Sequence, residues 1–134
     1  MKGVLSMKNN TNLEVIRIDS AEDVAKHFVY SEDVKGNRLF RFADQDYTGT
    51  VEITSSGARA LGDNWKDMFE ETKVSKIIAK DASNVTDMSG MFCFSRAISL
   101  DLSSFDTSNV TNMSGMFWES KAISIDLSNF DTLN

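Results

Sequence analysis

The sequence predicts an α/β protein in which a small N-terminal α+β cap, residues 1–64, is followed by a short solenoid, residues 65–134. Residues 81–105 and 106–130 align without a gap and agree at 18 of 25 positions, and the start of a third copy, DTLN, follows them. Self-similarity at a period of about 20–50 residues is typical of repeat architectures. Before the repeat, residues 13–54 carry the patterns of one helix and several strands.

The cap is predicted from periodicity and turn residues. Leu13–Ile18 alternates as a strand with one wet face, and Ser20 is placed to cap a helix. Two further strands, Arg38–Ala43 and Thr50–Thr54, flank the turn-like residues 44–49 and are expected to form a hairpin. The apolar stripe of the predicted helix consists of Ala21, Val24, Ala25, Phe28 and Val29.

Residues 65–80 resemble a degenerate copy of the repeat, which we call the worn copy. Met68-Phe69 echoes the same pair in each clear copy, but it lies 23 residues before Met91 instead of 25. Trp65–Glu71 is predicted to form a helical turn and Val74–Lys80 a strand. An atypical terminal unit is expected in a repeat protein, because it packs against something different.

Each clear copy divides into a strand and a short helix. In the strand, isoleucine and leucine alternate with serine and aspartate, so the apolar side chains are expected to point inward. In the segments VTDMSGMF and VTNMSGMF, apolar residues recur at a spacing that suits a short α- or 3₁₀-helix. The inward residues predicted are Ile98, Leu100, Leu102, Ile123, Ile125 and Leu127 in the strands, and Val85, Met88, Met91, Phe92, Val110, Met113, Met116 and Phe117 in the helices.

Aspartates recur in two columns, which leaves two interpretations open. One column holds Asp81, Asp106 and Asp131, and the other holds Asp101 and Asp126. Stacked carboxylates could bind Ca²⁺, or each could accept hydrogen bonds from the following backbone amides as an Asx-turn. We favour the turns, and expect no metal and no other cofactor. By the same argument, the side chains of Asn84 and Asn109 are expected to form an internal amide ladder that bonds neighbouring coils.

The composition excludes several classes of function. The net charge is −6 and the pI about 4.7, which argues against direct binding of nucleic acid. A single histidine, His27, and a single cysteine, Cys93, give no disulfide and no metal cluster, and no other base is available to activate the thiol. Nothing in residues 13–64 supports an active site. We therefore expect a protein that is not an enzyme.

No segment approaches the roughly 20 apolar residues that a membrane span needs. Residues 1–12 lack the apolar core of a secretory signal peptide. A complete chain is therefore expected in the cytoplasm, whereas a fragment of a larger protein could come from the cell surface.

Two runs, FDTSNVTNMSGMF at Phe105–Phe117 and DLSSFDTSNVT at Asp101–Thr111, resemble a bacterial surface-protein repeat of about 25 residues. That repeat occurs in BspA-like leucine-rich-repeat proteins and in mycoplasmal lipoproteins. The resemblance is strong over residues 81–134 and weak over residues 65–80. It implies a right-handed leucine-rich-repeat-like solenoid, often part of long cell-surface proteins and often linked to adhesion.

The function predicted first is a non-enzymatic protein–protein interaction module on a rigid scaffold. Positions that differ between the copies are expected to face outward, and Trp118 is the best candidate for a hot spot, because tryptophan buries a large area in interfaces. The candidate partner-binding residues are Trp118, Glu119, Lys121, Phe94, Arg96, Asp101 and Asp126.

Three alternatives concern the partner. The C-terminal edge could pair with a second copy and form a homodimer, because an open strand edge invites pairing. The chain could be a fragment of a cell-surface adhesin. It could also be a small acidic intracellular inhibitor from a mobile element, similar to anti-CRISPR proteins, whose interaction would be sensitive to salt. The edge residues are Ile123, Ile125, Leu127 and Phe130, and the acidic residues are Asp19, Glu22, Asp23, Glu32 and Asp33.

Overall fold

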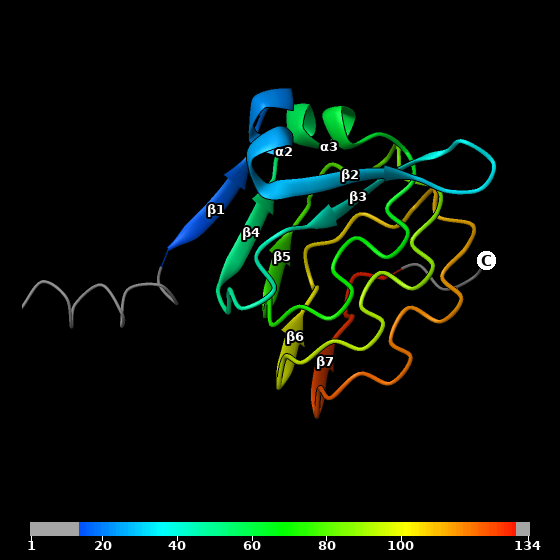
Figure 1. Ribbon diagram of the computed structural model, residues 1–134. Helices are drawn as coiled ribbons and strands as arrows, with labels where there is room; N and C mark the ends of the chain where they lie inside the picture. Colours follow the sequence, from blue (N-terminus) through cyan, green and yellow to red (C-terminus); the bar gives the residue numbers. More distant parts are fainter. Residues whose placement is uncertain (1–13, 131–134) are drawn as a thin grey trace, which may run out of the picture.

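The computed structural model describes residues 14–130, and its main feature is one parallel sheet of five strands (Figure 1). The strand order is β1-β4-β5-β6-β7, and a separate antiparallel hairpin consists of β2 and β3. The elements are β1 (Val15–Ile18), α2 (Ala21–His27), β2 (Phe28–Glu32), β3 (Arg38–Phe42), β4 (Thr50–Ile53), α3 (Ser55–Leu61), β5 (Lys76–Ile78), β6 (Ser99–Asp101) and β7 (Ser124–Asp126).

The predicted fold class, a cap followed by a right-handed leucine-rich-repeat-like solenoid, is wrong. The protein is instead an α/β structure on a single parallel sheet, with few helices. Strand β4, from the predicted cap, pairs with β5 along Thr50–Glu52, so both parts of the chain share the sheet. The alternating pattern of the copies misled the prediction, because strands of a parallel sheet show the same pattern. The boundary between residues 1–64 and 65–134 stays a prediction.

Helix α2 begins where the sequence predicts but ends early, and β1 (Val15–Ile18) lies within the predicted strand Leu13–Ile18. Ser20 caps α2 and its hydroxyl accepts a hydrogen bond from the amide of Asp23 (3.1 Å). The helix ends at His27, so Phe28 and Val29 belong to β2 instead of the helical stripe. Phe28 is buried and Val29 exposed because successive side chains of a strand point to opposite faces. Leu13 lies outside the described residues.

The predicted hairpin between Arg38–Ala43 and Thr50–Thr54 is also wrong. Strand β3 pairs antiparallel with β2 instead, from Phe28 opposite Phe42 to Glu32 opposite Arg38. The turn between them is closed by Asp33, whose carboxylate accepts hydrogen bonds from the amides of Lys35 and Asn37 (2.9 Å each). Strand β4 lies between β1 and β5, and its pairing with both is parallel.

Helix α3 was not predicted, although its start has a recognisable signal. The hydroxyl of Thr54 accepts a hydrogen bond from the amide of Gly57 (3.2 Å), as an N-cap does. Gly57 lies against the end of β1, and a Cβ atom there would overlap the carbonyl oxygen of Ile18. Only glycine therefore allows α3 to start so close to β1.

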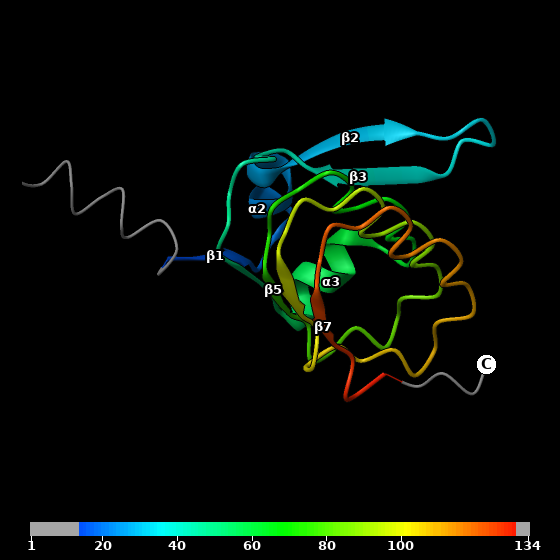
Figure 2. The same cartoon turned by 90° about the horizontal axis from the view of Figure 1, so that it is seen from below.

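A second row of main-chain hydrogen bonds joins the segments that precede β5, β6 and β7. The amide of Trp65 bonds the carbonyl of Asp87 (2.8 Å), and the amide of Met88 bonds that of Asn112 (2.8 Å). In Figure 2 these turn-rich segments lie across from the sheet. They form turns and isolated bridges and no helix, so the helical turns predicted there are wrong. The bends come from residues with positive φ, which are Asp67, Glu71, Gly90, Phe94, Gly115 and Glu119.

The core lies between these two rows and consists largely of repeated residues. The rings of Phe69, Phe92 and Phe117 stack in a column with centroids 5.7 and 5.9 Å apart, and those of Phe105 and Phe130 stack in another at 5.9 Å. Met68 and Phe69 are fully buried, as the worn-copy prediction requires. All predicted inward residues of the first copy are buried except Ile98.

Ile98 and its equivalent Ile123 correct the predicted strand faces. Both were expected inside, but their side chains are 72% and 86% exposed. Ala97 takes the inward position instead, held by a hydrogen bond from its amide to the hydroxyl of Ser95 (3.2 Å). The strict alternation starts only at Leu100, because β6 begins at Ser99.

The helices among residues 14–130 have seven residues each, and none is long and apolar enough to cross a membrane.

Candidate functional site

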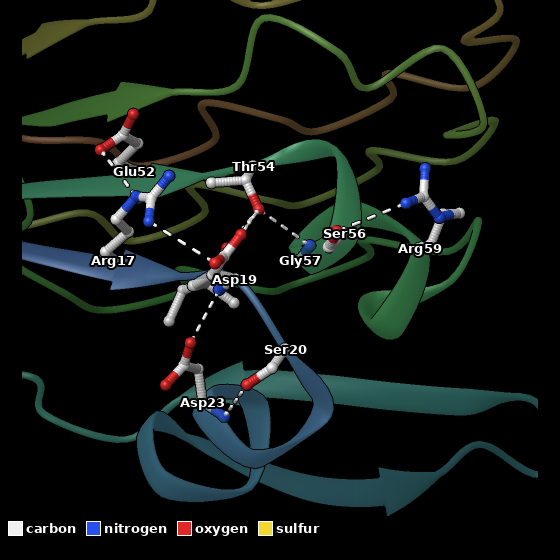
Figure 3. A network of polar contacts seen from close by, with 10 residues as sticks. Arg17, Asp19, Ser20, Asp23, Glu52, Thr54, Ser56, Gly57 and Arg59 are labelled. Atoms are coloured by element: carbon white, nitrogen blue, oxygen red, sulfur yellow. Dashed lines mark hydrogen bonds and ion pairs between the residues drawn. The ribbon is translucent and has the colours of Figure 1, made fainter.

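The carboxyl ends of β1 and β4 carry a network of polar side chains (Figure 3). Ligands in α/β proteins often bind at this edge of a parallel sheet, which makes the network a candidate site. Arg17 forms ion pairs with Asp19 (3.5 Å) and Glu52 (3.6 Å). The hydroxyl of Thr54 donates to the carboxylate of Asp19 (2.6 Å). The network therefore ties the end of β1 to the end of β4.

The acidic groups of this region have local structural roles. The carboxylate of Asp23 accepts a hydrogen bond from the amide of Asp19 (2.9 Å), which completes the cap of α2. Asp33 holds the turn of the hairpin, and the hydrogen bond from the Asn37 side chain lowers the pKa of its carboxyl. Three of the five acidic residues assigned to an inhibitor surface thus serve turns or caps. Glu22 and Glu32 lie exposed.

The repeated aspartates form Asx-turns. In each, the carboxylate accepts hydrogen bonds from the serine two residues later, as Asp106 does from the amide (3.1 Å) and hydroxyl (2.6 Å) of Ser108. Asp101 makes the same bonds to Ser103, which lower the pKa of its carboxyl. Among residues 14–130, no three His, Cys, Asp or Glu side chains come together as a metal site would require. Asp131 lies outside the described residues.

Asn84 and Asn109 bond neighbouring segments as predicted, but the predicted internal position of their side chains is wrong. The side-chain amide of Asn84 donates to the carbonyl of Gly62 (3.2 Å), and that of Asn109 donates to the carbonyl of Ser83. Both side chains lie at the surface.

Two of the predicted partner-binding residues, Phe94 and Trp118, meet at the surface. Their rings are perpendicular with centroids 5.2 Å apart, although they occupy different positions in their copies. Phe94 is 40% and Trp118 59% exposed. The amide of Phe94 donates to the carbonyl of Trp118 (2.8 Å), so the backbone also fixes the pair.

The charged candidates divide into two groups. The guanidinium of Arg96 donates to the carbonyls of Glu71 (3.0 Å) and Gln45 (2.8 Å), whereas Lys121 forms no ion pair with another described residue. Glu119 is exposed beside Trp118. The other group, Asp101 and Asp126, lies across β6 and β7 on the outward face of the sheet, where Asp101 pairs with Lys76 (3.7 Å).

Sequence reasoning missed Ile98 as a site residue and named Ile123 only as an edge residue, although both are exposed. They lie where the chain enters β6 and β7, and the amide of Ile123 donates to the carbonyl of Ile98 (2.8 Å). We call the set Phe94, Ile98, Trp118 and Ile123 the apolar corner. The signal that could have revealed it is the serine at position 95, whose hydroxyl turns Ala97 inward.

The predicted edge residues differ in their exposure. Ile125, Leu127 and Phe130 are half-buried against the core, whereas Ile123 faces solvent. Within the described residues, β7 is the last strand of the sheet and pairs only with β6. Pairing of this edge with a second copy stays a prediction.

His27 and Cys93 lie in different parts of the fold: His27 belongs to α2, and Cys93 to the turn-rich segments. His27 lies at the end of α2, where burial lowers its pKa. Cys93 follows the turn at Gly90, and burial with nearby carboxylates, including Glu70 and Asp67, raises the pKa of the thiol. A raised pKa keeps the thiol protonated and unreactive near neutral pH.

The repeated part of the chain has a family match. The family described as "Mycoplasma protein of unknown function, DUF285" matches residues 63–134, which is more than half of the chain. The chain belongs to the DUF285 family. The match supports the mycoplasmal side of the predicted resemblance and not the BspA-like proteins. No curated protein matches the chain, and no solved structure matches it.

The DUF285 match contains the apolar corner and both clear copies. The polar network of Figure 3 lies before it, in residues 17–59. Of the two surfaces, only the apolar corner is built from the DUF285 repeat.

Proposed function

We propose that this DUF285 chain is a non-enzymatic protein-binding module and that the apolar corner is its contact surface. One observation carries the proposal: four large apolar side chains are exposed on two adjacent, equivalent segments, residues 94–98 and 118–123. The rings of Phe94 and Trp118 are in contact, and Ile98 and Ile123 are joined by a main-chain hydrogen bond. Scattered apolar residues are normal on a protein surface, but exposed apolar residues that lie together mark interaction sites.

The backbone of the corner is fixed before any partner binds. The amide of Lys121 donates to the carbonyl of Ser95 (2.9 Å), midway between the bonds at Phe94 and Ile123. A preorganised surface loses little conformational entropy on binding, so more of the contact energy appears as affinity.

The conformation of Phe94 adds a second argument. Its φ is +58°, and the equivalent residues Glu71 and Glu119 are also left-handed. A left-handed conformation costs a bulky L-residue about 1–2 kcal/mol, so phenylalanine is an unfavourable choice for this turn. Its ring lies exposed against Trp118. A role in binding a partner would explain why phenylalanine occupies this turn despite the unfavourable conformation.

The charged residues beside the apolar corner indicate which charge a partner should carry. Arg96 and Lys121 occupy equivalent positions beside the apolar side chains, although the chain as a whole is acidic. Arg96 already forms an ion pair with Asp46 (3.3 Å), so of these two cations Lys121 is the one left to a partner, and the surface suits a protein with an apolar depression and a carboxylate at its rim. Trp118 would be the residue whose truncation costs most affinity, since buried tryptophans dominate many interfaces.

The other predictions stay subordinate to this one. The acidic inhibitor stays a prediction: Asp19, Asp23 and Asp33 accept hydrogen bonds in caps and turns, which leaves their negative charges in place. A partner on a cell surface, as the predicted resemblance to adhesion proteins implies, stays a prediction.

Binding with matched variants tests the proposal. A protein captured by the wild-type chain is purified, and its affinity is measured by calorimetry for Trp118→Ala, for Ile123→Ser and for the control Val34→Ser. Val34 is a fully exposed apolar residue in the turn of the hairpin, away from the corner. We expect Trp118→Ala to weaken binding at least about tenfold and Val34→Ser to leave it unchanged. Equal affinities for all four proteins would exclude the corner as the contact surface.

A further inference from the structure

A groove of about 360 Å³ lies beside Trp118, on the side of the molecule formed by the turn-rich segments. It crosses three of them, and its walls include Lys66, Asp67, Asn112 and Trp118. The groove shares only Trp118 with the apolar corner, so a ligand packed on this indole would compete with a protein partner for that one residue.

The floor of the groove is main chain. Gly90 and Gly115 both line it, with φ of +64° and +65°. A Cβ atom on Gly115 would meet nothing within 4 Å, whereas one on Gly90 would overlap the Asp67 carboxylate. The Asp67 carboxylate therefore covers Gly90, whereas at Gly115 a ligand can approach the backbone without meeting a side chain.

Three polar groups in the groove are not used in hydrogen bonds within residues 14–130. The carboxylate of Asp67 has the charges of Lys66 and Arg41 near it but forms no hydrogen bond with either, and burial raises its pKa. The side chain of Asn112 uses only its oxygen, which accepts from the amide (3.0 Å) and hydroxyl (2.8 Å) of Ser114. Its NH₂ group is left free to donate. The groove thus offers one strong acceptor and two donors next to an indole.

We propose that this groove binds a saccharide. A pyranose ring has an apolar C–H face that can pack on the indole of Trp118, and hydroxyls that both donate and accept hydrogen bonds. Those hydroxyls can donate to Asp67 and accept from Asn112 and Lys66, so each group finds a partner. The volume is in the range of about 300–1,000 Å³ that small-ligand sites occupy, and suits one or two sugar rings.

Other ligand classes satisfy the groove less well. A phosphate would be repelled by the carboxylate of Asp67, and a metal ion by the ammonium of Lys66. A wholly apolar ligand would cover the half-buried Asp67 without giving it a hydrogen bond, which is costly. A neutral ligand with many hydroxyls avoids all three penalties.

The two tryptophans allow a direct test by fluorescence. Trp65 is fully buried and Trp118 is exposed, so a ligand that packs on Trp118 should shift only the emission of the exposed indole. The probes are the methyl glycosides of glucose, galactose, mannose and N-acetylglucosamine, titrated to tens of millimolar, with saturation-transfer NMR as a second readout. We expect at least one probe to give a saturable shift and transfer to its ring protons.

Asn112→Asp is the sharpest variant, because the first copy already has aspartate at this position. Asp87 accepts the same bonds from Ser89 that Asn112 accepts from Ser114, so the turn should be kept while the NH₂ donor is lost. We expect this variant and Asp67→Asn each to weaken saccharide binding about tenfold. Ile123→Ser, in the apolar corner, should leave it unchanged.

Two results would overturn the proposal. One is the absence of a saturable response from all four probes in both readouts. The other is a response of equal midpoint in the wild type, Asn112→Asp and Asp67→Asn, which would mean that the sugar binds elsewhere. Loss of the protein partner in Ile123→Ser with saccharide binding intact would separate this site from the proposed interface.

Discussion

The two clear copies, residues 81–105 and 106–130, share 18 of 25 residues but differ in burial. Phe92, Leu100 and Phe105 of the first copy are at most 2% exposed, whereas the equivalent Phe117, Ile125 and Phe130 are only half-buried. Because the side chains are nearly the same, the difference comes from their neighbours. How far a side chain is buried therefore depends on whether its copy has neighbouring segments on both sides, and not on the sequence of the copy.

The neighbours can be named. Phe92 lies between Phe69 and Phe117, and β6 lies between β5 and β7. Within the described residues the second copy has such contacts on one side only. Equivalent substitutions in the two copies should therefore have unequal effects, which makes the copies controls for one another.

The largest difference is expected for the phenylalanine column. Phe92→Ala should cost about 3–5 kcal/mol of unfolding free energy, the usual range for a buried phenylalanine. Phe117→Ala should cost roughly half as much, because the half-buried ring loses less buried area. Urea denaturation followed by circular dichroism measures both. Equal losses would show that Phe117 is buried in solution and that the contrast between the copies is wrong.

The glycine pair should show a smaller difference in the same direction. Either Gly115→Ala or Gly90→Ala places alanine at positive φ, which costs about 1–2 kcal/mol. Gly90→Ala should cost about 1 kcal/mol more, because its Cβ must displace the carboxylate of Asp67. Thermal unfolding of the two variants side by side gives the comparison. If Asp67→Asn/Gly90→Ala behaves like Gly90→Ala alone, the charge of that carboxylate does not contribute.

Two aspartates should respond to pH in opposite directions. Hydrogen bonds from Ser103 lower the pKa of Asp101 below its ordinary 3.8, so its contribution is present above that value and is lost as pH falls through the lowered folded pKa. Burial raises the pKa of Asp67, so the neutral form favours folding and stability is lost as pH rises from 3.8 through its folded pKa.

Measuring the unfolding free energy between pH 2 and 7 tests these two opposite pH dependences. Asp101→Asn should be less stable than wild type at neutral pH and equal to it at the acid end. Asp67→Asn should be no less stable than wild type at neutral pH. Each effect should stay below about 1 kcal/mol, since both side chains are partly solvated. Parallel curves for Asp101→Asn and wild type across the whole range would contradict the assignment.

The smallest effect on stability is expected at the apolar corner. Trp118→Ala should change the unfolding free energy by less than about 1 kcal/mol, because the ring is mostly solvated and packs only edge-on against Phe94. The same denaturation assay serves, with Val34→Ser as the surface control. A loss comparable to that of Phe92→Ala would mean that Trp118 is part of the core.

Local signals in the sequence predicted local structure well. Ser20 and Asp23 marked the start of α2, and the repeated Asp-x-Ser units predicted the Asx-turns. The apolar positions of the first copy predicted the core, and the varying positions included both rings of the Phe94–Trp118 pair. In each case the interacting residues are close in sequence or repeat at a fixed period.

Pairing between strands could not be predicted in the same way. Strand β3 was assigned to β4 because a turn joins them, but β3 pairs with β2, and β4 pairs with β1 and β5. Partners 35 residues apart, such as Val15 and Thr50, leave no local pattern. The groove beside Trp118 was missed for the same reason, since its walls come from three separate turns.

Met68 lies 23 residues before Met91, whereas the clear copies repeat every 25 residues, and this difference in length affects the apolar corner. The carbonyls of Thr72 and Ser95 accept equivalent main-chain hydrogen bonds, from the amides of Arg96 and Lys121. Lys76 lies opposite Asp101 in the sheet. The chain therefore advances four residues between these two points in the worn copy, from Thr72 to Lys76, and six in the first clear copy, from Ser95 to Asp101. The two additional residues are Ile98 and Ser99 by position, one of which is the exposed isoleucine of the corner. A length change of two residues therefore adds or removes a contact side chain while the sheet keeps its register.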